Sequence, residues 1–338
     1  MTLTERNQQV YIDIKFSVHK EHLNSSVKEM KKQLVIEIGT NTIKMLYAER
    51  DGAVWKILSD DLYPTRIGAG KAQTGRLSAD GITRSLTAIG DIISKRSDLK
   101  VNGIHIIATE SLRSADNANE FINAVREQFG LSVDIISGLD EARYAFLAAA
   151  SEPLDPEGTI AVLDIGGGST ELTIGKKDEI IHQQSYQVGA VKLTEQFMQN
   201  NPPLASEIEA AKVFVADQIQ DISHAVSLSE MIGVGGSVTT LVLLAIPQEK
   251  SLIINIEEAI SMIDRTYLSL DQISDFITKL SALTVQERER LPLMPKGRAD
   301  IILAGTLILD IMMRRLNMQK ITVSTRGVRY GYLYSRCS

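Results

Sequence analysis

Two short stretches place a carboxylate beside a glycine turn, and they are the residues best suited to chemistry. They span residues 37–42 and 164–169. Asp164 lies 127 residues after Glu37 (164 − 37), and the same offset separates the glycines and hydroxyl residues of the two copies. Free N–H groups of a glycine turn can bind an anion, and glycine allows a phosphate to approach the backbone closely. The spacing predicts two duplicated units whose turns face each other across an anion-binding cleft.

Each turn is followed by a second β-type segment, at residues 43–48 and 170–174. Both segments alternate in polarity or are rich in β-branched residues, which is typical of strands. In P-loop and dinucleotide-binding folds the turn opens a helix instead, and no Gly-Lys-Ser/Thr sequence follows either turn. We therefore interpret both turns as tips of β-hairpins. A third turn, at residues 235–237, follows a strand and opens a helix.

Composition points to a globular enzyme of about two domains. The chain has 338 residues, 44% of them hydrophobic and 23% charged, with a net charge of −6. That charge excludes a protein that attracts DNA by its overall field. A single cysteine favours a reducing compartment, and we expect the cytoplasm. No apolar run reaches the roughly 18–20 residues of a membrane span, so no membrane partner is expected.

The order of elements gives the fold class and the domains. Strands alternate with helices in both halves, which predicts an α/β fold. Residues 1–30 lie outside the repeat and are expected to be a dispensable N-terminal extension. Residues 31–152 form the first predicted lobe and residues 153–338 the second. Three predicted capping pairs mark helix starts: Ser206 with Glu209, Ser269 with Gln272, and Thr284 with Glu287.

Four motifs, taken in order, resemble the exopolyphosphatase / guanosine pentaphosphate phosphohydrolase (Ppx/GppA) family. They lie at residues 109–113, 137–143, 164–171 and 297–305. The resemblance implies duplicated actin-like (RNase H-like) lobes with the active site in the interlobe cleft, in the short form of the family without its C-terminal helical domain. It also implies release of the terminal phosphate from inorganic polyphosphate or from pppGpp, with Mg²⁺ or Mn²⁺.

The resemblance also suggests roles for individual residues. Hydrolysis of a phosphoanhydride needs a positioned water and neutralised charge. We expect Glu141 to act as general base and Arg113 to clamp phosphate oxygens. Asp164 and Glu37 are the predicted metal ligands. The predicted phosphate-binding residues are Asn41, Thr42, Gly167, Gly168, Ser169, Gly236 and Ser237, and the cations predicted to line a groove for the rest of a long anionic chain are Arg66, Lys71 and Arg76.

Three residues depart from the family pattern. Glu37 stands where the family usually has Asp, and Thr325 and Tyr330 replace two acids of its last motif. These changes keep open a weakly active regulator that binds polyphosphate or guanosine phosphates. An ATP-dependent kinase on the same scaffold is a further alternative, because a fold does not decide a function. Polyphosphate and pppGpp present the same terminal phosphoanhydride, so both substrates stay open, and we allow for a homodimer.

Overall fold

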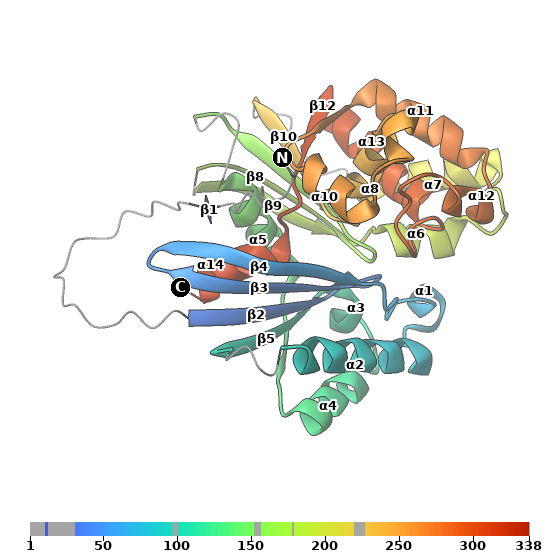
Figure 1. Cartoon of the computed structure of the whole chain (residues 1–338). Helices are drawn as coiled ribbons and strands as arrows, with labels where there is room; N and C mark the ends of the chain where they lie inside the picture. The colour runs from blue at the N-terminus through green and yellow to red at the C-terminus, as the bar shows by residue number, and fades with distance from the viewer. Residues whose placement is uncertain are drawn as a thin grey trace.

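Two mixed six-stranded sheets form the framework of the computed structural model (Figure 1). The structure describes residues 11–12, 31–96, 101–151, 157–177, 179–219 and 227–337. The strands of the first sheet are β1 (Tyr11–Ile12), β2 (Lys31–Ile38), β3 (Ile43–Asp51), β4 (Val54–Tyr63), β5 (Gly103–Ala108) and β6 (Val133–Ile135). Those of the second are β7 (Ile160–Ile165), β8 (Thr170–Lys176), β9 (Glu179–Tyr186), β10 (Glu230–Val234), β11 (Tyr267–Ser269) and β12 (Lys320–Val323).

The predicted N-terminal extension, residues 1–30, lies outside the described residues except for β1. That strand pairs antiparallel with β4 at the edge of the first sheet.

The two sheets repeat one strand pattern. In the first, β4, β3 and β2 form an antiparallel meander, and β5 and β6 continue it in parallel. In the second, β9, β8 and β7 form the meander, and β10 and β12 continue it. The repeated order confirms the α/β class and the duplication expected from the constant offset. It also confirms that the first two glycine turns are hairpin tips, because each joins two antiparallel strands.

Helices cover the sheets and also lie between them. The first part of the chain forms α1 (Lys71–Thr74), α2 (Ala79–Ser94), α3 (Glu110–Arg113), α4 (Ala118–Phe129) and α5 (Gly138–Ala150). The rest forms α6 (Ala190–Phe197), α7 (Ala205–Gln218), α8 (Gly236–Ala245), α9 (Gln248–Ser251), α10 (Ile256–Ile263), α11 (Leu270–Ser281), α12 (Val285–Glu289), α13 (Ile302–Arg315) and α14 (Val328–Arg336). No helix in the described ranges is long and apolar enough to cross a membrane.

Two of the three predicted helix caps are confirmed. Ser269 and Thr284 accept hydrogen bonds from the backbone three residues on. The predicted pair of Ser206 and Glu209 is wrong, because the cap lies two residues earlier, at Leu204, and α7 begins at Ala205. There Glu207 accepts the Leu204 N–H at 2.9 Å, so the acid one turn in satisfies the helix start without a hydroxyl cap.

The middle layer joins the two sheets. Helices α5 and α14 lie side by side between them (Figure 1), and α14 packs against β2 and β3 although it follows the last strand of the second sheet. Their shared core takes Val35 from β2, Phe146 from α5, Val162 from β7 and Leu333 from α14. Both sheets therefore bury their central strands on two faces, which is why residues 34–36 of β2 and 160–163 of β7 are all apolar rather than alternating.

A candidate active site between the glycine turns

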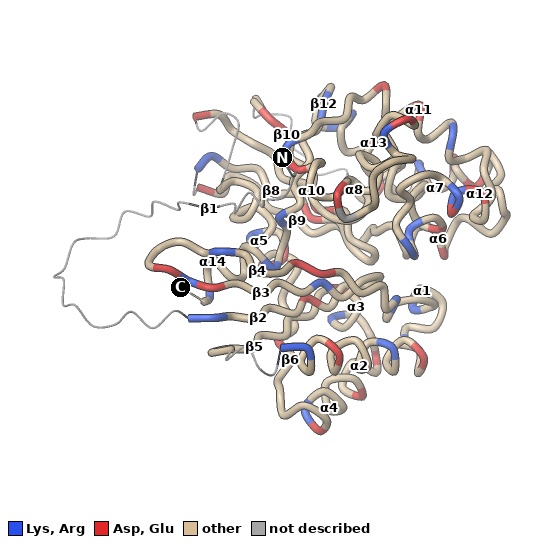
Figure 2. The backbone as a smooth tube through the Cα atoms, in the orientation of Figure 1, with Lys and Arg blue, Asp and Glu red and all other residues tan. Residues whose placement is uncertain are grey.

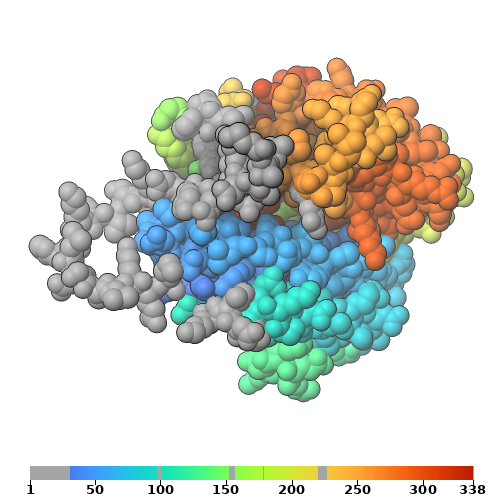
Figure 3. Space-filling model, in the orientation of Figure 1, coloured from blue at the N-terminus to red at the C-terminus, as the bar shows by residue number. Residues whose placement is uncertain are grey.

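The first two glycine turns meet, as the duplicated pattern predicts. The same hydrogen bond closes both tips, from Gly39 N–H to Thr42 O at 3.2 Å and from Gly166 N–H to Ser169 O at 3.0 Å. Thr40 of the first tip packs against the second, where a Cβ on Gly167 would lie 2.8 Å from the Thr40 Cβ. Figure 3 shows the two units, blue to cyan and orange to red, meeting along the middle of the molecule.

Charge at one repeated position differs in sign between the two hairpins. On β2 and β3, Glu37 faces Lys44 and the two side chains form an ion pair at 2.5 Å. On β7 and β8, the equivalent pair is Asp164 and Glu171, two carboxylates. Burial and then the Asp164 charge raise the pKa of Glu171 to about 8, against hydrogen bonds from Ser185 and Ser169. Burial also raises the pKa of Asp164. The second hairpin therefore lacks positive charge that the first one carries.

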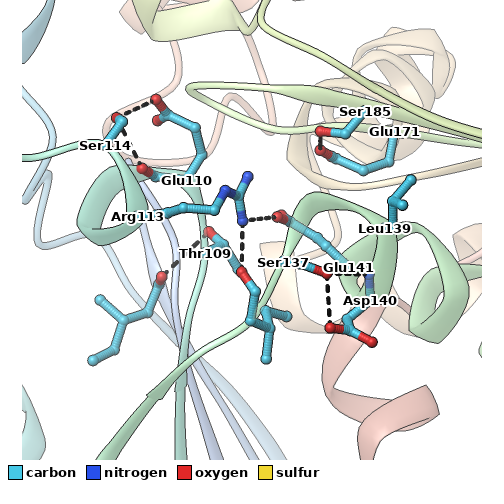
Figure 4. A network of polar contacts seen from close by, with 12 residues as sticks. Thr109, Glu110, Arg113, Ser114, Ser137, Leu139, Asp140, Glu141, Glu171 and Ser185 are labelled. Carbon is cyan, nitrogen blue, oxygen red and sulfur yellow. Dashed lines mark hydrogen bonds and ion pairs between the residues drawn. The ribbon is translucent and has the colours of Figure 1, made fainter.

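Glu141 lies beside this acidic pair, in the first turn of α5. Its carboxylate is buried, and Arg113 Nη1 lies 3.3 Å from Glu141 Oε2 and donates at 2.8 Å to the Ile136 carbonyl. Figure 4 shows Arg113 reaching from α3 toward Glu141, with Glu171 nearby. Burial and then the Glu171 charge raise the pKa of Glu141 well above its usual range, while Arg113 acts in the opposite direction. Arg113 Nη2 is buried and has no hydrogen-bond partner among the described residues.

A divalent cation fits the chemistry of these acids. Within the described ranges no three metal-ligating side chains are already gathered as a metal site. However, Glu171 Oε2 and Glu37 Oε2 are buried without a hydrogen-bond partner there, and an unpaired buried carboxylate oxygen is costly. Oxygen ligands of this kind suit Mg²⁺ or Mn²⁺. Of the two predicted ligands, Asp164 lies in the charge-deficient hairpin, whereas Glu37 already has Lys44 as its cation. Glu171, which the sequence analysis did not single out, faces Asp164 across the second hairpin, so it joins Asp164 and Glu37 as a candidate ligand.

The third turn approaches the other two. Gly235 has a φ of 91°, and a Cβ there would lie 2.6 Å from Asp164 Oδ1, so glycine is required. Asn41 Nδ2 donates to Gly297 O at 3.0 Å, and Arg298 Nη2 donates to Thr42 Oγ1 at 3.3 Å. Arg298 also packs against Gly236, and burial lowers its pKa to about 10.

The predicted phosphate-binding residues are thus gathered at the three turns, although two hydroxyls have other contacts. Ser169 hydrogen-bonds Glu171, and the Ser237 hydroxyl packs against Gly305 of α13. Sequence reasoning missed Arg298 as a cation at this position. The motif at residues 297–305 contained the signal, because it places an arginine directly after Gly297, whose carbonyl accepts a hydrogen bond from Asn41 of the first turn.

The three cations predicted to line a groove all have acidic partners. Arg66 pairs with Asp300, Lys71 with Glu110 at 2.8 Å, and Arg76 with Glu120 at 2.7 Å. Along the backbone, basic and acidic residues alternate over both units (Figure 2). A cavity of about 1070 Å³ lies beside the third turn, and its lining includes both cations (Lys44, Arg298, Arg326 and Arg329) and acids (Asp60, Asp61 and Asp264).

The residues that depart from the family's last motif have acidic partners as well. The Tyr330 hydroxyl donates to Asp60 at 2.7 Å, and Arg329 donates to the same carboxylate at 2.6 Å. The Thr325 N–H donates to Asp264 at 2.8 Å. Carboxylates from β4 and from the end of α10 thus contact the two residues that replace acids of the family motif.

Known proteins resemble this chain in sequence and in fold. Exopolyphosphatase 2 of Mycobacterium tuberculosis is 26% identical over 321 residues, which cover 89% of this chain and 97% of that protein. The crystal structure of the Aquifex aeolicus member of the Ppx/GppA family is 28% identical, with a TM-score of 0.74 and coverage of 91% of this chain and 98% of that one. An exopolyphosphatase from Cytophaga hutchinsonii, at 24% identity, a TM-score of 0.82 and coverage of 90% and 97%, shares the fold.

These likenesses establish the fold class as duplicated actin-like lobes, as the sequence predicted. Residues 45–338 match the sequence pattern of one family of phosphatases over most of the chain. The chain therefore belongs to the Ppx/GppA phosphatase family.

Proposed function

We propose that this protein is a Mg²⁺- or Mn²⁺-dependent hydrolase that releases the terminal phosphate of inorganic polyphosphate. The observation that carries the proposal is the buried Glu141 carboxylate, held by Arg113 beside the acidic pair Asp164 and Glu171. A buried carboxylate next to a cation site and a phosphate cradle can activate water, because the terminal phosphate is brought to it and competing solvent is excluded. The name of the M. tuberculosis relative supports polyphosphate as the first substrate to test.

Each side chain has one task in this proposal. Asp164 and Glu171 hold the cation, which supplies positive charge that offsets the carboxylates and the phosphoryl oxygens. Arg113 directs its unpaired Nη2 at a phosphate oxygen, as a guanidinium does well. The glycine turns support the phosphate from both lobes. Glu141 orients the attacking water and accepts its proton, while Arg113 Nη1 fixes the carboxylate in place.

A second substrate, pppGpp, is favoured by the large cavity. Its lining includes the apolar side chains of Tyr63, Leu243, Ile260 and Ile263 next to the basic ones, and it opens beside Gly235. A site for a nucleoside needs an apolar surface with a few polar groups, whereas a bare phosphate chain needs only cations. The cavity therefore offers room for a guanosine whose phosphates extend toward the turns.

One assay distinguishes the two substrates and the alternative functions. Phosphate release is measured from long-chain polyphosphate, tripolyphosphate and pppGpp, with Mg²⁺ and with EDTA. We expect Mg²⁺-dependent release and the highest kcat/KM with polyphosphate. A higher kcat/KM with pppGpp than with polyphosphate would identify pppGpp as the preferred substrate. ATP conversion to ADP only when an acceptor is added would identify a kinase, and binding of any of these ligands without turnover would identify a regulator.

A further inference from the structure

The carboxylate of Glu110 lies against the second glycine turn. Glu110 begins α3 in the first lobe, whereas Gly168 lies at the tip between β7 and β8 in the second. A Cβ on Gly168 would collide with Glu110 Oε2. That oxygen is buried and has no hydrogen-bond partner among the described residues. An acid of one lobe therefore lies at the turn where the other lobe is expected to receive a phosphate.

Two lysines and a hydroxyl stabilise the negative charge of this carboxylate. Lys71 Nζ lies 2.8 Å from Glu110 Oε1, and Ser114 donates to the same oxygen at 2.7 Å. Lys71 also contacts the Ser114 hydroxyl. Both Lys192 and Arg113 are close enough for their charges to oppose that of Lys71. The charges of Lys71 and Lys192 thus both act on the buried Glu110 carboxylate, whereas Arg113 is paired with Glu141.

Burial works against keeping either member of this pair charged. Burial alone would raise the pKa of Glu110, but the charge and hydrogen bond of Lys71 outweigh it and the pKa is lowered. Burial lowers the pKa of Lys71, and the Glu110 carboxylate only partly offsets that effect. Each group therefore depends on an oppositely charged partner: without the acid, burial favours the neutral form of the lysine, and an anion that takes the acid's place restores its charge.

The loop that carries Lys71 spans the two lobes. Glu195 of α6 accepts hydrogen bonds from the N–H groups of Gly70 at 2.6 Å and Ala72 at 3.3 Å. This contact holds the start of α1 against the second lobe, so Lys71 is positioned by both lobes. A lysine in such a position can bind whichever anion lies at the second turn.

We propose that Lys71 and Ser114 form a phosphate subsite beside Gly168, and that the Glu110 carboxylate occupies it as an internal anion which a substrate phosphate displaces. This inference rests on the proposed function, since it concerns the same cleft. A carboxylate and a phosphate both offer anionic oxygens to an ammonium and a hydroxyl, so one can replace the other. Glu110 then sets the affinity of the cleft for phosphate chains, because each binding event must break its contact with Lys71.

The test uses the full chain and the variant Glu110→Gln, which keeps the shape of the side chain and removes its charge. The control is Glu120→Gln, which removes one negative charge from the exposed pair with Arg76 on the same lobe. Inorganic tripolyphosphate is titrated in EDTA by calorimetry, so that binding is read without turnover. We expect Glu110→Gln to bind about fivefold or more tightly, a typical effect for one charged hydrogen bond, and Glu120→Gln to bind as the parent does.

Lys71→Met is the second variant and shows whether the tighter binding of tripolyphosphate depends on the lysine. Introduced together with Glu110→Gln, it should remove the gain. Unchanged or weaker binding by a folded Glu110→Gln protein overturns the inference. A raised Mg²⁺ requirement in that variant, with weaker binding, would make Glu110 a cation ligand and also overturn it. If no variant releases phosphate but Glu110→Gln still binds tripolyphosphate more tightly, the subsite stands and the proposed reaction fails.

Discussion

At the scale of single residues, the cleft contains buried carboxylates whose negative charge is not balanced by nearby cations. The pKa values of Glu141, Asp164 and Glu171 are all raised, with burial as the largest cause for each. Glu37, by contrast, has its own lysine. A perturbed group in a cleft is a candidate for function, and three together suggest one shared cation.

The general base is tested by Glu141→Gln. We expect kcat to fall by about 10²- to 10⁴-fold, because the amide cannot accept the proton of the attacking water. Binding of tripolyphosphate should be retained or strengthened, since one negative charge is removed while Arg113 and the turns remain. Phosphate release at saturating substrate gives kcat, and calorimetric titration gives the affinity. A kcat within about threefold of the parent would refute the role, because general-base catalysis is worth far more.

The cation site is tested by replacing its acids one at a time. Asp164→Asn and Glu171→Gln should each raise the Mg²⁺ concentration for half-maximal activity by at least about tenfold, because each removes an oxygen ligand or its close support. Glu37→Gln, whose parent residue is paired with Lys44, should shift it less. Activity is measured over a Mg²⁺ series. Equal shifts for Glu37 and Glu171 would show that Glu37 holds the cation as closely as Glu171 does.

At the scale of elements, the sequence predicted the hairpins and not what lies between the sheets. The constant offset gave both turns, and the register then places Lys44 opposite Glu37 and Glu171 opposite Asp164. The same offset relates residues 44 and 171, so this reversal of charge could be predicted from the sequence. The contact of α14 with α5 was not, because it joins residues almost 200 positions apart (Arg336 to Tyr144, 336 − 144) and no local pattern encodes it.

The helix pair between the sheets is tested at Gly331. In α14 a Cβ at this position would collide with the backbone of Tyr144 in α5. We expect Gly331→Ala to lower the free energy of unfolding by about 1–3 kcal/mol, despite the better helix propensity of alanine. Gly327→Ala is the control, since no heavy atom lies within 4 Å of its Cβ position. Denaturant unfolding of both variants measures the difference, and equal stabilities would contradict the close packing.

At the scale of the whole molecule, the chain returns to its first sheet at the end. After β12, α14 crosses back and Arg329 and Tyr330 both bind Asp60 on β4. Desolvation acts to lower the pKa of the buried Arg329, but the Asp60 carboxylate outweighs it and the pKa is raised. The two lobes are therefore connected by a charged contact as well as by the middle apolar core.

Asp60→Asn tests that connection. The amide cannot neutralise the Arg329 guanidinium, so we expect a loss of stability on the order of 2 kcal/mol, the usual effect of losing a hydrogen bond to a charged group. Asp61→Asn is the matched control: its carboxylate pairs with Arg96 at 2.6 Å but is 44% exposed, so its removal should cost less. Thermal unfolding compares the two variants. An equal loss of stability would show that the Asp60 contact with α14 stabilises the protein no more than the exposed Asp61 pair does.

Lys44 and Glu171 occupy equivalent positions of the two hairpins but carry opposite charges, so the two sides of the cleft differ. Two identical hairpins would create a site with twofold symmetry, whose two sides could not be told apart by a linear substrate. Here one hairpin carries the Lys44 ammonium, which also lines the large cavity, and the other carries a second acid, Glu171, where the proposed function places a cation. An enzyme that removes units from the end of a chain needs such polarity, because the end has to be recognised as an end. A single position in a duplicated sequence is enough to provide it.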